Sequence, residues 1–161
     1  MSEITPFSDE AQVARQILQE MLQQMGFEAT IEVEETPEQI DLTLISDRPM
    51  GLLIGKGGQT LNAIELLVRT ITQTKLHTLE KHIMVDAEGY RARHAEWLQG
   101  LARQAAEQVL ATGEPVPMEP MSPRDRRTVH MTLAEIEGVE SVSVGEEPYR
   151  HIVICLPGQS A

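Results

Sequence analysis

Apolar positions in the first part of the chain follow a helical spacing and then a strand spacing. Between Ser8 and Gly26 they recur every three or four residues, which predicts an amphipathic helix capped by Ser8 and ended by Gly26. Residues 29–33 and 40–44 instead alternate apolar and polar side chains, with Thr36-Pro37 between them. These two segments predict half-buried strands, the first with a glutamate-rich outer face.

A glycine cluster, Gly55-Lys56-Gly57-Gly58, divides the next part of the chain. Before it, residues 48–54 fit a single helical turn, and after it the spacing of apolar residues predicts a longer helix over 61–71. Residues 83–87 alternate again as a third strand. The predicted order is helix, strand, strand, short helix, glycine loop, helix and strand, which makes a complete small α+β unit.

The second part of the chain predicts a long helix, a proline-rich extended segment, another helix and two short strands. Ser122-Pro123 has the pattern of an N-cap followed by proline at the first helical position. These elements cover residues 91–112, 114–123, 122–138, 141–144 and 149–156. The fold class is therefore α+β. We expect two small units, 8–89 and 90–157, the second beginning with the long helix as a connection.

Composition excludes several classes of protein. No stretch approaches the ~20 apolar residues of a membrane span, and residues 1–7 lack the pattern of a secretory signal. The single cysteine, Cys155, excludes an intrachain disulfide. We therefore expect a cytoplasmic protein without membrane insertion.

The net charge of −12 disfavours a nucleic-acid partner, because phosphate binding needs local positive charge. The charge is unevenly distributed. Residues 1–47 hold one basic and eleven acidic residues, whereas residues 48–82 hold five basic and two acidic ones. Phosphate binding, if present, is expected to depend on local geometry.

The glycine cluster is the first candidate site. It does not match a Walker A loop, because Gly57 follows Lys56, nor a dinucleotide fingerprint, because Thr60 stands where a glycine is required. Gly55-x-x-Gly58 between two helices does allow bare backbone to approach a sugar-phosphate chain, with Lys56 supplying charge. The alternative is that the glycines only make a tight turn.

The second candidate is the pair Arg126 and His130, four residues apart on one helix face. An exposed arginine beside a histidine can contact a phosphate, the guanidinium through two hydrogen bonds and the imidazole as a donor. The alternative is a solvated arginine and a partly packed histidine.

Other conspicuous residues favour structural roles. We expect His94 and Trp97 to pack, Cys155 to be buried, and the methionines, Met131 among them, to fill gaps. We find no trio of nucleophile, base and orienting group, and no metal-ligand spacing. The chain is therefore expected to be no enzyme and to hold no cofactor or metal.

Several motifs follow one another along nearly the whole chain. They are Gly51-Leu52-Leu53-Ile54-Gly55-Lys56-x-Gly58-Gln59-Thr60-Leu61, Asp86-x-Glu88-Gly89-Tyr90-Arg91, Met121-Ser122-Pro123, Arg126-x-x-x-His130 and Gly145-Glu146-Glu147-Pro148-Tyr149-Arg150. This succession resembles the bacterial Jag family, the SpoIIIJ-associated proteins also called KhpB or EloR. The resemblance implies a type II KH domain, a three-stranded sheet with helices on one face, followed by an Arg-xxx-His single-stranded nucleic-acid-binding domain.

The resemblance also implies a function and its residues. It points to a cytoplasmic protein that binds single-stranded RNA, or single-stranded DNA, and acts as a post-transcriptional regulator linked to cell elongation, division or sporulation. A KH module clamps about four nucleotides. The residues carried over are Gly55, Lys56, Gly57 and Gly58 in the loop, Arg126 with His130, and Arg127 and Arg150 as phosphate neighbours.

The sequence differs from the family pattern in two ways. Many members have a separate small N-terminal domain, whereas this sequence starts almost directly at the KH unit. A second basic residue is common where Gly57 stands, so a weaker phosphate contact is expected. The alternative function is a protein-interaction module that pairs with a small KH-domain protein or a second copy of itself, with RNA binding weak or lost.

Overall fold

A computed structural model describes residues 7–159 of the chain. The prediction that residues 1–7 carry no secretory signal therefore lies outside the described residues, apart from Phe7. The chain divides into two compact units, residues 1–91 and 92–161. The elements in chain order are α1 (Asp9–Gln24), β1 (Thr30–Glu35), β2 (Gln39–Ile45), α2 (Gly51–Ile54), a 3-10 turn η1 (Lys56–Gly58), α3 (Gln59–Leu76), β3 (His82–Ala87), α4 (Tyr90–Thr112), β4 (Val116–Pro117), α5 (Pro123–Ala134), β5 (Glu140–Val144) and β6 (His151–Cys155).

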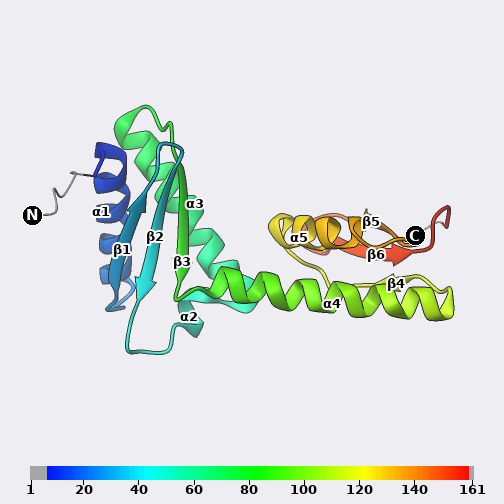
Figure 1. The fold of residues 1–161 in the computed structure, drawn as a ribbon. Coiled ribbons are helices and arrows are strands. Elements are labelled where there is room, and N and C mark those ends of the chain that lie inside the picture. The colour runs from blue at the N-terminus through cyan, green and yellow to red at the C-terminus, as the bar shows by residue number, and fades with distance from the viewer. Residues whose placement is uncertain (1–6, 160–161) are drawn as a thin grey trace, which may run out of the picture. The chain divides into compact units, whose positions relative to one another are not determined.

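The first unit is a three-stranded sheet covered on one face by α1 and α3 (Figure 1). β1 pairs antiparallel with β2, and β2 pairs parallel with β3, so the segment from α2 to α3 forms the crossover that a parallel pair requires. Alternate residues of β2, such as Ile40 and Leu42, are fully buried beneath the helices, whereas Asp41 between them is only half-buried. The predicted sheet with helices on one face is confirmed.

Glu35 links the end of β1 to the start of α1. Its carboxylate accepts hydrogen bonds from the Ser8 backbone N–H at 3.0 Å, from Lys81 Nζ at 2.5 Å and from the Ser8 hydroxyl. Burial alone would raise the pKa of Glu35, but the hydrogen bonds from Lys81 and Ser8 and the Lys81 charge lower it to about 2. Glu35 is only 13% exposed and so differs from Glu32 and Glu34 of the same strand, which are exposed.

The second unit is another three-stranded sheet, in the order β4-β6-β5, with both pairs antiparallel (Figure 1). Its core joins α4 and α5 to β6 through Leu98, Val109, Leu133, Ile152 and Ile154, among others. The prolines do keep the segment before α5 extended, and its residues Val116–Pro117 add an edge strand to the sheet.

Several predictions about single residues can be compared with these two units. Ser8 and Ser122 cap α1 and α5, with their hydroxyls accepting from the backbone N–H of Ala11 and Asp125. Cys155 is buried, as predicted. The predicted packing roles of Trp97 and Met131 are wrong, because each side chain is 60% exposed on the outer surface of its helix.

Among residues 7–159 no helix combines the length and the apolar character that crossing a membrane requires. The same residues contain no group of three or more His, Cys, Asp or Glu side chains placed to hold a metal ion.

Candidate nucleic-acid interface

The glycine loop is shaped by two close contacts within the first unit. Gly55 has φ +72°, and a Cβ there would lie 2.3 Å from Thr60 Oγ1 and 2.9 Å from the Thr60 nitrogen. Gly58 has φ +79°, and a Cβ there would lie 2.9 Å from Tyr90 Cε1. Both positions therefore require glycine for the loop itself, because a side chain would be strained in conformation and would collide.

The tip of the loop, Lys56-Gly57, is exposed, whereas Gly58 is buried beside Tyr90. Gly57 also has a positive φ, +58°, but an added Cβ would meet nothing within 4 Å. Only part of the predicted clamp therefore faces solvent. Lys56 and Gly57 are open to a ligand, whereas Gly55 and Gly58 fix the loop on the start of α3.

The basic residues of the first unit differ in what they contact. Arg48 forms an ion pair with Glu28 at 3.5 Å, and Lys81 is paired with Glu35. Arg91 donates to Asn62 Oδ1 at 2.9 Å and to Glu65 Oε2 at 2.8 Å, which ties the start of α4 to α3. The Lys56 side chain is exposed and has no hydrogen-bond or ion-pair partner within residues 7–159. It is therefore a cation of this unit that remains available to a phosphate.

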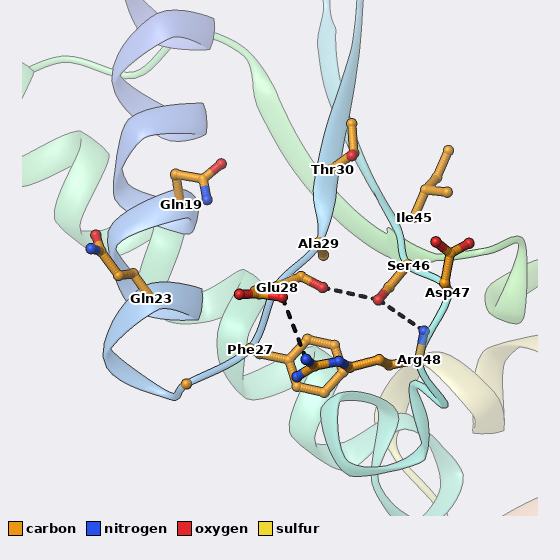
Figure 2. Close-up of a pocket in the computed structure, with 11 residues that line it drawn as sticks. Gln19, Gln23, Phe27, Glu28, Ala29, Thr30, Ile45, Ser46, Asp47 and Arg48 are labelled. Atoms are coloured by element: carbon orange, nitrogen blue, oxygen red, sulfur yellow. Dashed lines mark hydrogen bonds and ion pairs between the residues drawn. The ribbon is translucent and has the colours of Figure 1, made fainter.

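A hollow of about 820 Å³ lies at another part of the unit, between the end of α1 and the ends of β1 and β2 (Figure 2). Among its lining residues, Arg48 is the single cation, and it already pairs with Glu28. Ser46 completes this wall by donating to the Glu28 carbonyl at 2.9 Å and accepting from the Arg48 N–H at 3.1 Å. The hollow includes none of the predicted binding residues, and with Asp47 also lining it, it is a poor phosphate site.

Arg126 in the second unit does not have the exposed guanidinium on which its predicted role rests. The residue is 8% exposed. Its Nη1 donates to the Met121 carbonyl at 2.7 Å, and its Nη2 donates to Glu147 Oε1 at 2.6 Å. The buried part of α5 therefore carries a charged side chain that holds the β5–β6 turn and the segment before α5 together.

His130 and Arg150 lie along the margin between α5 and the edge strand β5. His130 Nδ1 is 2.6 Å from Ser141 Oγ, and Arg150 Nε donates to Ser143 Oγ at 2.9 Å. Arg150 also donates to the Gly145 carbonyl at 3.1 Å. Burial, and then the Arg126 charge, lower the pKa of His130 below its ordinary value of 6.5, so the ring is neutral at pH 7.

The structure thus brings together three of the four predicted residues of the second unit at the β5–β6 hairpin, and leaves Arg127 apart. Arg127 lies on the outer surface of α5 and is exposed, and its side chain has no hydrogen-bond or ion-pair partner in the described part of the chain. It is therefore the predicted arginine of this unit that is free to meet a phosphate.

Sequence reasoning missed the partners of these side chains. In the sequence Glu147 stands out only as part of a motif, and Ser141 and Ser143 only as strand residues. The two serines are separated by one residue, so they face the same side of β5, and this alternation was a usable signal. No signal in the sequence indicates the ion pair between Arg126 and Glu147, because the two residues are twenty-one positions apart and their contact depends on how the hairpin turns.

Comparison with known families divides the chain in the same two parts. The KhpA/KhpB KH domain model matches residues 11–84, and the model of the Arg-xxx-His domain matches residues 96–156. A Bacillus subtilis protein, "RNA-binding protein KhpB", is 35% identical over 151 residues, which are 91% of this chain and 70% of that protein. The chain belongs to the KhpB family.

Other KhpB relatives agree with this assignment. The "RNA-binding protein KhpB" of Clostridium symbiosum is 38% identical over 132 residues, and that of Lactiplantibacillus plantarum is 32% identical over 138 residues. The matched residues are 82% and 84% of this chain. The chain spans 59% of the length of the first of these KhpB proteins and 42% of the second.

Proposed function

We propose that this KhpB-family chain binds single-stranded RNA without catalysis, using the glycine loop of its first unit as the main contact. The observation that carries the proposal is the exposed tip Lys56-Gly57, which stands directly before α3. The names of the KhpB relatives support the choice of RNA as ligand.

The physical basis of the proposal is the chemistry of a phosphate at this tip. Gly57 has no side chain and open space around it, so a sugar-phosphate backbone can approach the main chain closely. The first turn of α3 adds a positive dipole end, and Lys56 adds a full charge. An unpaired strand can follow such a loop because its backbone is flexible and its bases are free to splay.

The second unit adds a further contact in this proposal. Arg127 supplies a charge from the outer surface of α5, while Arg126, His130 and Arg150 shape the neighbouring hairpin. Two modest sites on one chain raise each other's effective concentration when one strand reaches both. Neither site then needs to bind tightly alone, which fits a chain with a net charge of −12.

Fluorescence anisotropy with a labelled oligouridine tests the main contact through Gly57→Asp, compared with Gly57→Asn. Both side chains tolerate a positive φ and enter open space, so both variants are expected to fold. The aspartate places a negative charge at the phosphate site, and we expect it to weaken binding at least about tenfold relative to the asparagine. Equal affinities of the two variants, or no binding by the parent, would contradict the proposal.

A second candidate function is association with another KH-domain chain, and one observation favours it. Leu66 and Leu67 on α3 are about half-exposed, at 53% and 49%, which is unusual for neighbouring leucines on a folded helix. Sedimentation of the parent and a Leu66→Glu, Leu67→Glu double variant tests it. A monomeric parent, alone and with a single-domain KH protein, would speak against this function.

A further inference from the structure

Trp97 is the single tryptophan of the chain, and it lies on the outer surface of α4 with 60% of its surface exposed. It belongs to neither of the two hydrophobic cores. A tryptophan is rarely so open, because its indole is the largest side chain and gains free energy when it is covered. An exposed indole on a folded helix therefore suggests that a ligand or partner covers it.

A chain of contacts holds this indole from one side. The His94 and Trp97 rings are stacked, with centroids 5.7 Å apart and planes 25° from parallel. His94 Nε2 lies 3.1 Å from Asp125 Oδ2, and these two side chains are only 17% and 12% exposed. Asp125 in turn is fixed in the capped first turn of α5, where its N–H donates to Ser122 Oγ. One ring face thus rests on an anchored support.

We propose that Trp97 is a stacking platform for an unpaired base of single-stranded RNA, a role that rests on the RNA binding proposed above. Every base offers a π-face, so an indole fixed from behind accepts a base without regard to sequence. The support by His94 and Asp125 means that little side-chain freedom is lost on binding. The base adds a second layer to the stack that His94 begins.

The surroundings of Trp97 favour a nucleotide over an apolar protein surface. Arg93 lies one helical turn before Trp97 on the same face of α4 and is exposed, so a positive charge stands on the side of α4 that carries the indole. Glu96, the residue before Trp97, is also exposed. A protein partner that covered this part of α4 would have to bury the charges of Arg93 and Glu96, whereas a base touches the ring face alone.

Intrinsic fluorescence provides a direct test, because Trp97 is the only indole. We expect saturating oligouridine to quench this fluorescence, since a stacked base deactivates the excited indole, while anisotropy of the labelled oligonucleotide reports binding in the same samples. An oligonucleotide of equal length that lacks bases gives the matched control and should not quench. Binding without quenching would overturn the platform and leave the proposed function intact, whereas absence of binding would overturn both.

Variants separate stacking from a structural effect. Trp97→Ala is expected to weaken oligouridine binding about tenfold, and Trp97→Phe, which keeps an aromatic face, only about threefold. Met131→Ala removes a side chain of equal exposure from α5 and should bind as the parent does. Parent-like affinity in Trp97→Ala would overturn the proposal, and if the same variant lost self-association in sedimentation, the indole would belong to a protein interface instead.

Discussion

The glycine loop of the first unit and the Arg-xxx-His helix of the second unit present their motif residues in opposite ways. In the loop, Lys56 and Gly57 face solvent, and the glycines that the fold requires lie on either side of them. In the helix, Arg126 is 8% exposed and already bonded to Glu147 and the Met121 carbonyl. One motif leaves its charge available, whereas the other uses its charge internally.

This difference shows that a basic residue in a binding motif is not by itself evidence of a phosphate contact, because the fold can bury and pair its charge. The Arg126 side chain is only 10% exposed and is already paired with Glu147, whose own side chain is 55% exposed, so its charge is balanced within the protein. Arg126 is then a positioning residue, which fixes the turn between β5 and β6. Arg127, in contrast, is exposed and keeps its charge on the surface of α5.

The largest effect that we predict is on the stability of the second unit. Arg126→Ala removes two charge-assisted hydrogen bonds, at 2.7 and 2.6 Å, and leaves the Met121 carbonyl without this donor. We expect it to lower the free energy of unfolding by about 2–4 kcal/mol. Denaturant unfolding followed by Trp97 fluorescence measures this, because the only tryptophan belongs to the second unit.

Arg127→Ala is the matched control for Arg126. The side chain is exposed and unpaired among residues 7–159, so its removal should change stability by less than about 0.5 kcal/mol. A parent-like unfolding midpoint for Arg126→Ala would mean that the contrast between the two arginines is wrong.

Gly57 and Gly58 allow an exposed and a buried position to be compared within one motif. Gly58→Ala places a Cβ 2.9 Å from Tyr90 Cε1 at a φ of +79°, so we expect a loss of about 2–3 kcal/mol from collision and backbone strain. Gly57→Ala enters open space at φ +58° and should lose only about 1 kcal/mol. Thermal unfolding of the first unit ranks the two variants, and equal losses would show that Tyr90 does not constrain the loop.

Charge at the loop tip gives a smaller effect, on RNA affinity. Lys56→Ala should weaken oligouridine binding several-fold and reduce the slope of log affinity against log salt by about 0.7, the value for one single-strand phosphate. Lys75→Ala removes an exposed lysine from the opposite end of α3 and should leave both quantities unchanged. An equal loss in the two variants would indicate general attraction and no local site.

The fold could be predicted from the sequence because its signals are local. The spacing of apolar residues in α1, the alternation in β1 and β2, and the Ser122-Pro123 start of α5 each depend on a few neighbouring residues. The pairing of Val116–Pro117 with β6 was missed, since a two-residue strand has no periodicity and is defined by a distant partner.

The site was only partly predictable, and the reason is long-range pairing. Exposure of the Lys56-Gly57 tip follows from glycine chemistry, but the cover of Tyr90 over Gly58 arises between residues thirty-two positions apart. The bonds of Arg126 to Glu147 and of His94 to Asp125 likewise depend on tertiary structure. The residue type determines which hydrogen bonds and ion pairs a side chain can form. Whether those bonds are already formed within the protein depends on the tertiary structure.

The last effect that we predict is a difference in acid sensitivity between the two units. Burial and the Arg126 charge lower the pKa of His130 below 6.5, so below that pH the unfolded chain takes up a proton that the folded unit does not. The second unit therefore loses stability as the pH falls below 6.5, by no more than about 1.4 kcal/mol per pH unit.

Glu35 affects the stability of the first unit in a lower pH range. Its pKa is lowered from 4.5 to about 2, so its contribution to the first unit is complete above 4.5 and is lost as the pH falls toward 2.

Below pH 6.5, and above the range in which Glu35 takes up its proton, protonation of His130 in the unfolded chain therefore weakens the second unit alone. Urea unfolding at several pH values, followed by Trp97 fluorescence, should show a falling midpoint in the parent. His130→Gln keeps a polar group near Ser141 Oγ but cannot take up a proton, so its midpoint should fall less over this interval. If the urea midpoints of parent and variant fell equally, the neutral state of His130 would not be a source of the acid sensitivity. The buried Arg126 charge would then have no measurable effect through His130.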